Sequence, residues 1–294
     1  MGLASLVPLI PLILVLWCVY VSDALWWATS NSLILTGSRI GEFRAQHGPR
    51  LPVRDGMGFF APPLFPPFRH SFEFDLGAGA EAGRKPAKRA DIERRVALAL
   101  SLAAPLRKLG EGLFIYLFVV APLAISSFGP LRIWAPLLTI LVVWLTAIVL
   151  TYRRSWRRLH QAHPSGWKSD AALMVLSPPG AILAADRLTR KALHGVSGMR
   201  VMSVITPAHE FCRTARLMYF DEPTPRQLAA KREIEEILES EGMDAVFVAP
   251  PVRESGMKGF CQRCHGQVMR DSGDCPDCLV PITAFDEPDV RRSA

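Results

Sequence analysis

The chain has 294 residues, of which 50% are hydrophobic and 21% are charged, and its formal net charge at pH 7 is +7. Six cysteines are too few for the disulfide framework of a secreted scaffold of this length. The hydrophobic residues are gathered in long uncharged runs, which excludes a simple soluble protein and predicts a mainly α-helical membrane protein. We expect three transmembrane helices, helical cytoplasmic segments and a small cysteine-based module near the C-terminal end.

The first predicted element is a transmembrane anchor within residues 1–30. Residues 1–22 carry no charge, and residues 3–21 are enough to cross about 30 Å of hydrocarbon as a helix. Trp26 and Trp27 follow, as is typical of a membrane–water interface. A cleaved signal peptide is the alternative, but the run has no basic residue before it and no small-x-small site after it. We therefore favour an uncleaved anchor.

Residues 31–111 are predicted to form a cytoplasmic loop with several short elements. Residues 32–36 favour a strand, and the Pro/Phe-rich stretch 59–68 favours irregular backbone, because proline restricts its own conformation and that of the preceding residue. The small and basic stretch 77–90 is typical of a flexible linker. An amphipathic helix is predicted over 91–106, with acidic residues in its first turn.

A transmembrane helical hairpin is predicted over 112–152. Residues 112–131 and 133–152 are uncharged, and Arg132 separates the two runs. The stretch 126–130 contains serine, glycine and proline, which favour a turn. The sequence therefore predicts one arm over about 112–126 and a second over about 133–152.

Basic residues flank this hairpin unevenly, and they predict its orientation. The turn carries only Arg132, whereas the outer ends of the arms carry Arg107, Lys108, Arg153, Arg154, Arg157 and Arg158. Basic segments next to membrane spans are retained in the cytoplasm. We therefore expect a multi-pass protein of the bacterial inner membrane, with its N-terminus outside and its C-terminus in the cytoplasm.

Residues 153–257 are predicted to form a helical cytoplasmic region. The uncharged run 171–185 is interrupted by Pro178-Pro179-Gly180, which favours two short helices over a fourth span, and its insertion into the membrane stays open. Further helices are expected over 186–194, 206–219 and 224–242, where proline, capping residues and glycine mark the ends.

Two C-x-x-C pairs carry the strongest chemical signal in the chain. Cys261 and Cys264 form the first pair, and Cys275 and Cys278 form the second. Each pair offers two sulfur atoms from one turn, and two such turns can supply the four thiolates of a tetrahedral metal site. We expect these four cysteines to bind one metal ion.

This spacing resembles the zinc-ribbon or rubredoxin-like family over residues 258–285, followed by a tail over 286–294. The resemblance implies that the four cysteines bind a structural Zn²⁺. His265 and Leu279 stand where the family often has glycine. Iron suits four thiolates equally well. A c-type haem attachment at C-x-x-C-H is disfavoured because that modification occurs outside the cytoplasm.

A site closed by four cysteines has no position for substrate or water, so we expect a structural rather than a catalytic metal. Within 258–281, basic and acidic side chains balance, and a nucleic acid partner is not expected. The sequence favours an anchored interaction or scaffold protein, with membrane lipid and a cytoplasmic protein as partners. The alternative is a membrane enzyme, or a subunit of one, whose active site lies within 156–219 and whose small-molecule substrate is unknown.

Overall fold

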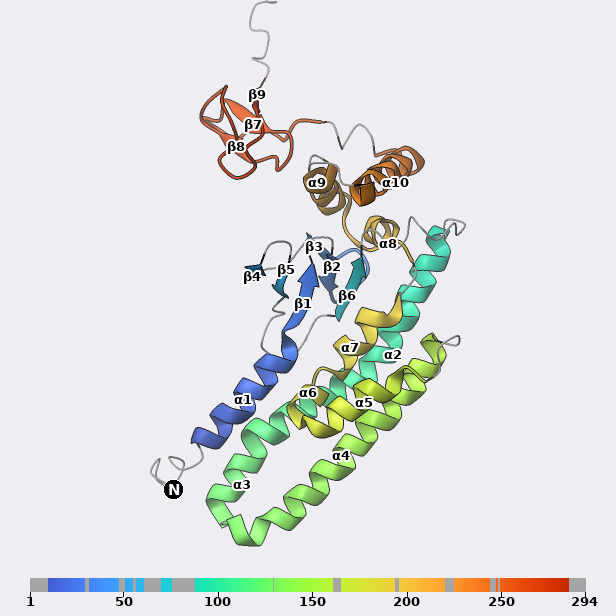
Figure 1. Cartoon of the computed structure of the whole chain (residues 1–294), viewed down its shortest axis with the longest axis vertical. Helices are drawn as coiled ribbons and strands as arrows, with labels where there is room; N and C mark the ends of the chain where they lie inside the picture. The colour runs from blue at the N-terminus through green and yellow to red at the C-terminus, as the bar shows by residue number, and fades with distance from the viewer. Residues whose placement is uncertain are drawn as a thin grey trace, which may run out of the picture.

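The computed structural model describes residues 10–29, 32–47, 51–54, 57–60, 70–75, 88–128, 130–160, 165–193, 196–219, 225–243, 247 and 249–285. Most of the described residues are helical. Figure 1 shows three tiers along the long axis of the molecule. A bundle of helices forms one end, two small sheets and further helices form the middle, and a small β-module forms the other end.

The helical end is built on one long hairpin. Its first arm consists of α2 (Arg89–Ile115), a π-helical turn η4 (Tyr116–Val120) and α3 (Ala121–Phe128). The second arm is α4 (Pro130–Leu159). The first arm is continuous over 40 residues, so the helices predicted separately over 91–106 and 112–126 are one helix, and a boundary at 111 falls inside it. Pro105 lies inside α2 and does not end it, so the helix continues from the first stretch into the second.

The π-helical turn has a local cause in Pro122. This proline has no N–H to donate, and its ring would collide with the carbonyl of Phe118 in a regular helix. The N–H of Ala121 instead bonds the carbonyl of Tyr116, five residues earlier, and the helix widens by one residue. The arm therefore continues past the proline rather than ending there.

Side chains bond the backbone across the two arms. The indole Nε1 of Trp144 donates to the carbonyl of Leu109 at 2.9 Å. The hydroxyl of Tyr116 donates to the carbonyl of Leu137 at 2.5 Å. Gly112 permits this packing, because a Cβ there would lie 2.4 Å from the Trp144 ring. The polar ends of both aromatic residues are thus satisfied inside the bundle.

Two helices of the described chain are long and apolar enough to cross a membrane, not the three that the sequence predicts. They are the two arms of the hairpin, Arg89–Phe128 and Arg132–Leu159. Helix α1 (Ile10–Ala24) is apolar, but its 15 residues cover only about 22 Å. Residues 1–9 of the expected anchor lie outside the described residues.

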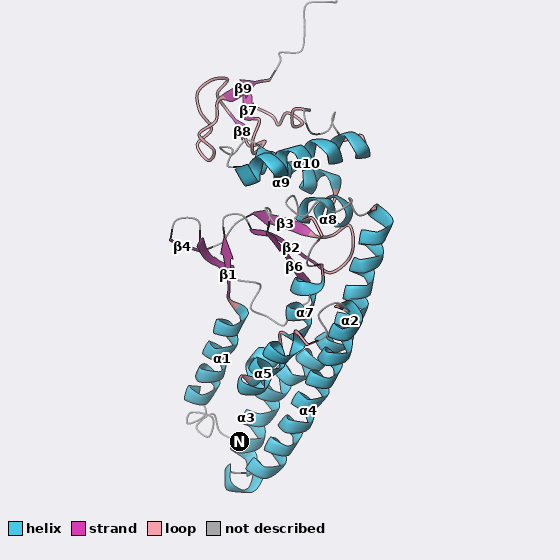
Figure 2. Cartoon of the chain, turned by 45° about the vertical axis from the view of Figure 1, so that its right-hand side comes forward, coloured by secondary structure: helices cyan, strands magenta, loops and turns pink. Residues whose placement is uncertain are grey.

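Two three-stranded antiparallel sheets form the middle of the molecule (Figure 2). One has the order β3-β2-β6, with strands β2 (Ser32–Gly37), β3 (Arg44–His47) and β6 (His70–Asp75). The other has the order β1-β5-β4, with strands β1 (Trp26–Thr29), β4 (Leu51–Arg54) and β5 (Met57–Phe60). The strand predicted over 32–36 is confirmed.

Two expectations for this region need correction. Phe59 and Phe60 belong to β5, because they pair with β1, and are not irregular backbone. Trp26 and Trp27, expected at a membrane–water interface, belong to β1 and pair with Phe60 and Phe59, so the chain is already in a sheet two residues after α1. Residues 61–69 and 76–87, which hold most of the Pro/Phe-rich stretch and of the predicted linker, lie outside the described residues.

Helices α7 (Ala184–Ala192), α8 (Gly198–Ile205), α9 (Ala208–Tyr219) and α10 (Pro225–Glu241) complete the middle tier. The apolar faces of α8, α9 and α10 share a buried core with β2, β6 and the first turns of α2. The buried residues of α7, Ala184, Ala185 and Leu188, belong instead to the core of the helical end. Gly242 has φ +64° and ends α10, as predicted. Helix α8 was not predicted, although Ser197 precedes it at the N-cap position.

The uncharged run 171–185 divides as its prolines predict. It forms most of α5 (Trp167–Leu176), then α6 (Pro178–Ala181), which begins with two prolines, and then the start of α7. Figures 1 and 2 place α5 beside the hairpin, on the side of α7 that faces the hairpin turn. A Cβ atom added to Gly110 would lie only 2.4 Å from the carbonyl oxygen of Ile182. This segment therefore packs directly on α2.

Candidate metal centre

The β-module at the end of the chain is a small three-stranded antiparallel sheet. Its strands β7 (Gly259–Cys261), β8 (Gln267–Val268) and β9 (Ile282–Ala284) have the order β8-β7-β9. One C-x-x-C turn connects β7 to β8, and the other precedes β9. Because Cys261 pairs with Ile282, the sheet brings the two turns to the same end.

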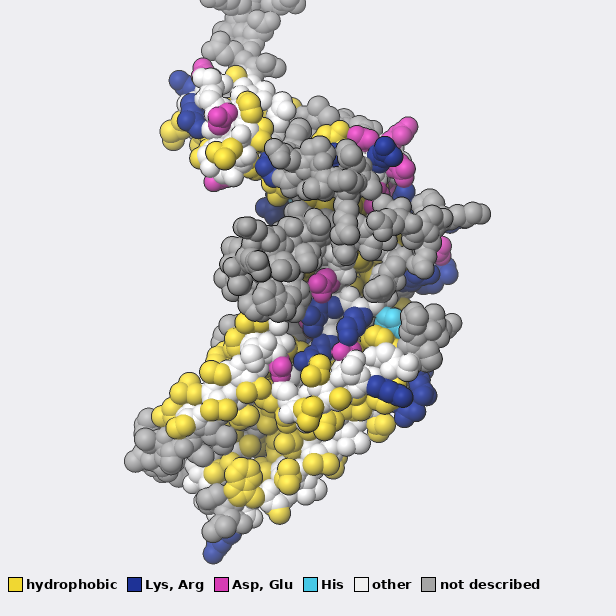
Figure 3. All heavy atoms as spheres, viewed as in Figure 1, with side chains coloured by type: hydrophobic (Ala, Val, Ile, Leu, Met, Phe, Trp, Pro, Cys, Tyr) yellow, Lys and Arg dark blue, Asp and Glu magenta, His cyan; other side chains and the backbone are white. Residues whose placement is uncertain are grey.

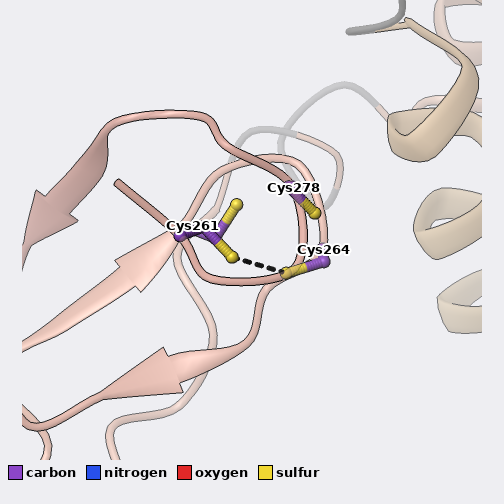
Figure 4. Close-up of side chains that lie close together, drawn as sticks. Cys261, Cys264 and Cys278 are labelled. Carbon is purple, nitrogen blue, oxygen red and sulfur yellow. Dashed lines mark hydrogen bonds between the residues drawn. The ribbon is translucent and has the colours of Figure 1, made fainter. Parts of the chain in front are cut away.

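All four cysteines that the sequence predicts as ligands come together here. The sulfur atoms of Cys261, Cys264, Cys275 and Cys278 lie within 4.8 Å of one another, so the cluster could hold a metal ion. Figure 4 shows the sulfurs of Cys261 and Cys264, from the first turn, close to that of Cys278, from the second turn. The sulfurs of Cys264 and Cys275 are 3.7 Å apart. In a tetrahedral site with metal–sulfur bonds of about 2.3 Å, neighbouring sulfurs lie about 3.8 Å apart.

The same spacing excludes disulfide bonds within the cluster. A disulfide joins its sulfurs at about 2.05 Å, and all four cysteines are free thiols. Of the two other cysteines, Cys212 is buried in the core and Cys18 is exposed on α1. The four sulfurs thus form a single group, as in a zinc-ribbon-like module.

The backbone of the first turn holds its two cysteines in a fixed arrangement. The N–H of Cys261 donates to the carbonyl of Gly266 at 3.0 Å, and the N–H of His265 donates to the carbonyl of Cys261 at 2.8 Å. The N–H of Gly266 also points at the sulfur of Cys264, at 3.3 Å. Such a donor favours the thiolate form that a metal requires.

The second turn repeats this pattern. The N–H of Cys275 donates to the carbonyl of Val280 at 2.8 Å, and the N–H of Leu279 donates to the carbonyl of Cys275 at 2.9 Å. His265 and Leu279 occupy equivalent positions and have φ angles of 58° and 54°. Both adopt the left-handed conformation that favours glycine. His265 and Leu279 therefore adopt the backbone conformation of the glycines that the zinc-ribbon family often has at these two positions.

Electrostatic repulsion among the cysteine thiolates favours the binding of a cation between them. Burial and the neighbouring thiols raise the pKa of Cys278 to about 12, because charges this close oppose one another. Burial would also raise the pKa of Cys275, but hydrogen bonds from the N–H groups of Asp277 and Cys278 lower it overall. A divalent cation offsets the repulsion and replaces the protons, so acid opposes metal binding.

His265 connects the first turn to helix α9. Nη1 of Arg216 lies 3.1 Å from Nδ1 of His265, and Nε of Arg216 donates to the carbonyl of Phe247 at 2.8 Å. Arginine can only donate, so Nδ1 accepts and the ring proton lies on Nε2. Burial and the charge of Arg216 lower the pKa of His265 to about 4. His265 is therefore a neutral link between the metal turn and the helical region.

The sequence did not predict this link. Arg216 is one of many arginines in the chain and lies 49 residues before its partner. Its position on the predicted helix 206–219 could be derived, but neither its burial nor its partner could. A contact between two elements that are distant in sequence leaves no pattern in either one.

We expect Cys275→Ser to remove the metal from the purified full-length protein, because a serine hydroxyl is a poor ligand and three thiolates leave the shell open. His265→Ala should retain the metal, because Nδ1 of His265 is bonded to Arg216. Elemental analysis of metal per chain measures both variants. Loss in His265→Ala together with retention in Cys275→Ser would place the histidine in the metal shell and refute the four-thiolate arrangement.

We expect Leu279→Gly to leave the module unchanged or to stabilise it by up to about 1 kcal/mol, because a left-handed residue other than glycine is strained. The Leu279 side chain is 81% exposed, so little packing is lost. His265→Gly is the matched control: it relieves the same backbone strain but removes the Arg216 contact, and it should destabilise. Thermal unfolding with and without a chelator measures both, and a clear loss of stability in Leu279→Gly would contradict the strain argument.

The metal centre is therefore defined by the geometry of the chain alone. Four sulfurs converge from two turns with the same backbone pattern. Their mutual distances suit a tetrahedral ion. No family model, curated protein or solved structure matches the chain.

Proposed function

We propose that this chain is a multi-pass protein of the bacterial inner membrane that presents a zinc-stabilised ribbon to a protein partner in the cytoplasm. The observation that carries the proposal is the closed four-cysteine cluster, which is fixed to the helical region through His265 and Arg216. The metal has a structural role in this proposal, and the ribbon surface supplies the binding function.

The membrane location is supported by how little of the hairpin is buried. Only 28% of the most apolar stretch in the first arm and 17% of that in the second arm are buried within the molecule. The core helix of a soluble protein would be mostly buried. Figure 3 shows hydrophobic side chains covering the visible face of this end of the molecule. A large exposed apolar surface is typical of a membrane or protein interaction site, and lipid is the occupant that we propose.

The orientation is supported by charge and by the packing of α1. Six basic residues lie at the hairpin end that adjoins the sheets, whereas the turn carries Arg132. Trp17 of α1 packs against Phe118 at 5.8 Å, and Tyr20 packs against Phe114 at 5.9 Å. Helix α1 is therefore antiparallel to the first arm, and its N-terminal end points toward the hairpin turn. With the basic end in the cytoplasm, the N-terminus lies outside.

Zinc is the metal that we propose for the cluster. Four thiolates suit zinc and iron, but the described residues identify no electron partner for a redox-active iron. Zinc in such a site contributes about 10–16 kcal/mol of apparent binding energy, which acts as folding energy. A sheet as small as β7–β9 depends on this contribution, because its strands contain only two or three residues each.

Exposed apolar side chains on and beside the ribbon favour a protein partner. Val252, Met269 and Leu279 are 91%, 75% and 81% exposed. Basic residues Lys258, Arg263 and Arg270 are balanced by acidic residues Asp271, Asp274 and Asp277, which disfavours nucleic acid. A surface with apolar anchors and balanced charge is typical of protein recognition.

The described ionisable residues of 156–219 do not favour the enzyme alternative. Lys191 pairs with Asp170, Arg190 with Asp186, and Arg213 with Glu210. These pairs join secondary-structure elements or successive helical turns, so each has a structural explanation. We therefore propose the interaction function alone.

A reporter enzyme that is active only outside the cytoplasm should be active when inserted between Phe128 and Pro130, and silent when fused after Ala294. The reason is that the basic hairpin ends are retained in the cytoplasm. A reporter that is active only in the cytoplasm, placed at the same two positions, should give the opposite pattern. The proposed orientation is wrong if both reporters give the reversed result.

Met269→Glu and Leu279→Glu should each abolish the binding of a partner that co-purifies with the wild-type protein, because a charge replaces an exposed apolar anchor. Ser272→Glu adds the same charge at an exposed polar position of the ribbon and should leave binding unchanged. Quantitative mass spectrometry of detergent-purified protein compares the variants, and metal content checks that the ribbon is intact. Equal recovery of every co-purifying protein from all three variants would exclude the ribbon as the docking module.

A further inference from the structure

We infer that the segment from Trp167 to Ala192 is a shallow re-entrant hairpin, which dips into the lipid from the same side as both of its ends. Its partner is the cytoplasmic leaflet itself, with acyl chains against the exposed face of α5 that ends at Leu176 and anionic headgroups at the ends of the segment. The inference rests on the proposed membrane location. It extends that proposal from the two long helices to a segment too short to cross.

The two ends of the segment are held together at one place on α4. The carboxylate of Asp170, in the first turn of α5, accepts hydrogen bonds from the Tyr152 hydroxyl at 2.6 Å and from the Lys191 ammonium at 2.8 and 2.9 Å. Lys191 lies in the last turn of α7. Because the first and last turns share one carboxylate, the chain returns to the level at which it started and does not cross.

Further contacts from α4 reinforce this arrangement. His160 bonds the Lys191 carbonyl through Nε2 at 2.7 Å and stacks on Trp156 at 4.0 Å. The Lys191 ammonium lies 5.8 Å from the Trp156 ring, and the Arg153 guanidinium lies 5.2 Å from the Trp167 ring. Arg153 and Trp156 lie near the C-terminal end of α4 and His160 follows it directly, so all three side chains are at the basic end of the hairpin, where headgroups are expected. Both ends of the segment are therefore anchored at headgroup level.

Between these ends the segment extends toward the membrane interior. Leu176 lies six residues beyond Asp170 on α5, which places it about 9 Å further along the helix. The chain then turns at Ser177, whose hydroxyl donates to the carboxylate of Asp23 near the end of α1. A Cβ on Gly180 would lie 2.5 Å from that carboxylate, so the turn packs closely against α1. The tip is thus fixed from two sides by α1 and α2.

The outer surface of the segment matches one lipid leaflet. Leu173, Val175 and Leu176 are 51%, 57% and 82% exposed, while Ala171 and Met174 face inward. Apolar side chains of the second arm, such as Leu138 at 59% and Val143 at 64%, are exposed to a similar degree. At the ends, Lys168 is exposed, as are the α4 residues Arg154, Arg157 and Arg158. An apolar tip below a basic rim is complementary to acyl chains below anionic headgroups.

The test measures where three positions lie relative to lipid and water. Leu176→Cys at the tip, Lys168→Cys at the start and Leu138→Cys in the exposed middle of α4 are each made in a Cys18→Ser protein and labelled with a nitroxide. The full-length proteins are reconstituted into vesicles of phosphatidylethanolamine and phosphatidylglycerol. Collision rates are measured with oxygen, which enters the acyl region, and with a nickel chelate, which remains in water. The Cys18→Ser parent measures labelling of the remaining cysteines.

The re-entrant hairpin predicts a ratio of oxygen to nickel collisions that is several-fold higher for Leu176→Cys than for Lys168→Cys and approaches the ratio for Leu138→Cys. Equal ratios for Leu176→Cys and Lys168→Cys would place the tip in water and overturn the inference. Low rates with both reagents for Leu176→Cys would show a protein neighbour, such as a second copy, and would also overturn it. If Leu138→Cys itself reports water, the membrane location fails, which is a separate outcome.

Discussion

The constraint on which the rest of the structure depends is the apolar surface that the α2–α4 hairpin leaves uncovered. The described elements that pack against it, such as α1, leave only 28% and 17% of the two apolar stretches buried. Burial of apolar surface stabilises a protein by about 25 cal/mol per Å², and in the proposed function lipid provides that burial. In that proposal, the apolar surface determines where the basic residues of the hairpin lie relative to the bilayer. It also determines on which side of the bilayer the sheets lie and how deep α5 can reach.

Inside an apolar environment every backbone polar group needs a partner from the protein. The hairpin provides such partners where the helix departs from regular α-helical geometry and where a polar side-chain group lies inside the bundle. The wide turn at Tyr116 keeps the first arm hydrogen-bonded past Pro122. Trp144 and Tyr116 bring polar groups into the bundle, and each donates to a carbonyl of the opposite arm. The same interactions fix the arms against each other, so satisfaction of polar groups and packing specificity have a common origin.

The sequence predicted what depends on local pattern. Uncharged runs located the hairpin, proline and glycine located the ends of α6, α9 and α10, and the C-x-x-C spacing located the four sulfurs that the structure brings together. Two predictions were wrong, and each error has a local cause in the sequence. The charged residues within 107–111 divided into two predictions a helix that is continuous, and the uncharged N-terminal run predicted a span that the described residues of α1 are too short to form.

What could not be predicted depends on contacts between distant parts of the chain. The pair formed by His265 and Arg216, and the carboxylate of Asp170 shared by Tyr152 and Lys191, join elements that are separate in sequence. The left-handed conformation of Leu279 is similar: leucine disfavours it, and only the repeated hydrogen bonds of the turn enforce it. In each case the surrounding fold overrides the preference of the single residue.

Because the first arm is one continuous helix, a tilt of its apolar stretch also moves its other end. From Arg89 to Glu111 the helix extends about 34 Å beyond the apolar stretch, and its buried residues Ile92 and Val96 belong to the core that holds β2, α8 and α9. Transmembrane helices adjust their tilt to the thickness of the bilayer. A change in tilt of about 5° displaces the far end of such an arm by about 3 Å, by simple trigonometry on that length. In the proposed membrane location, a change in bilayer thickness would therefore displace the region that carries the ribbon.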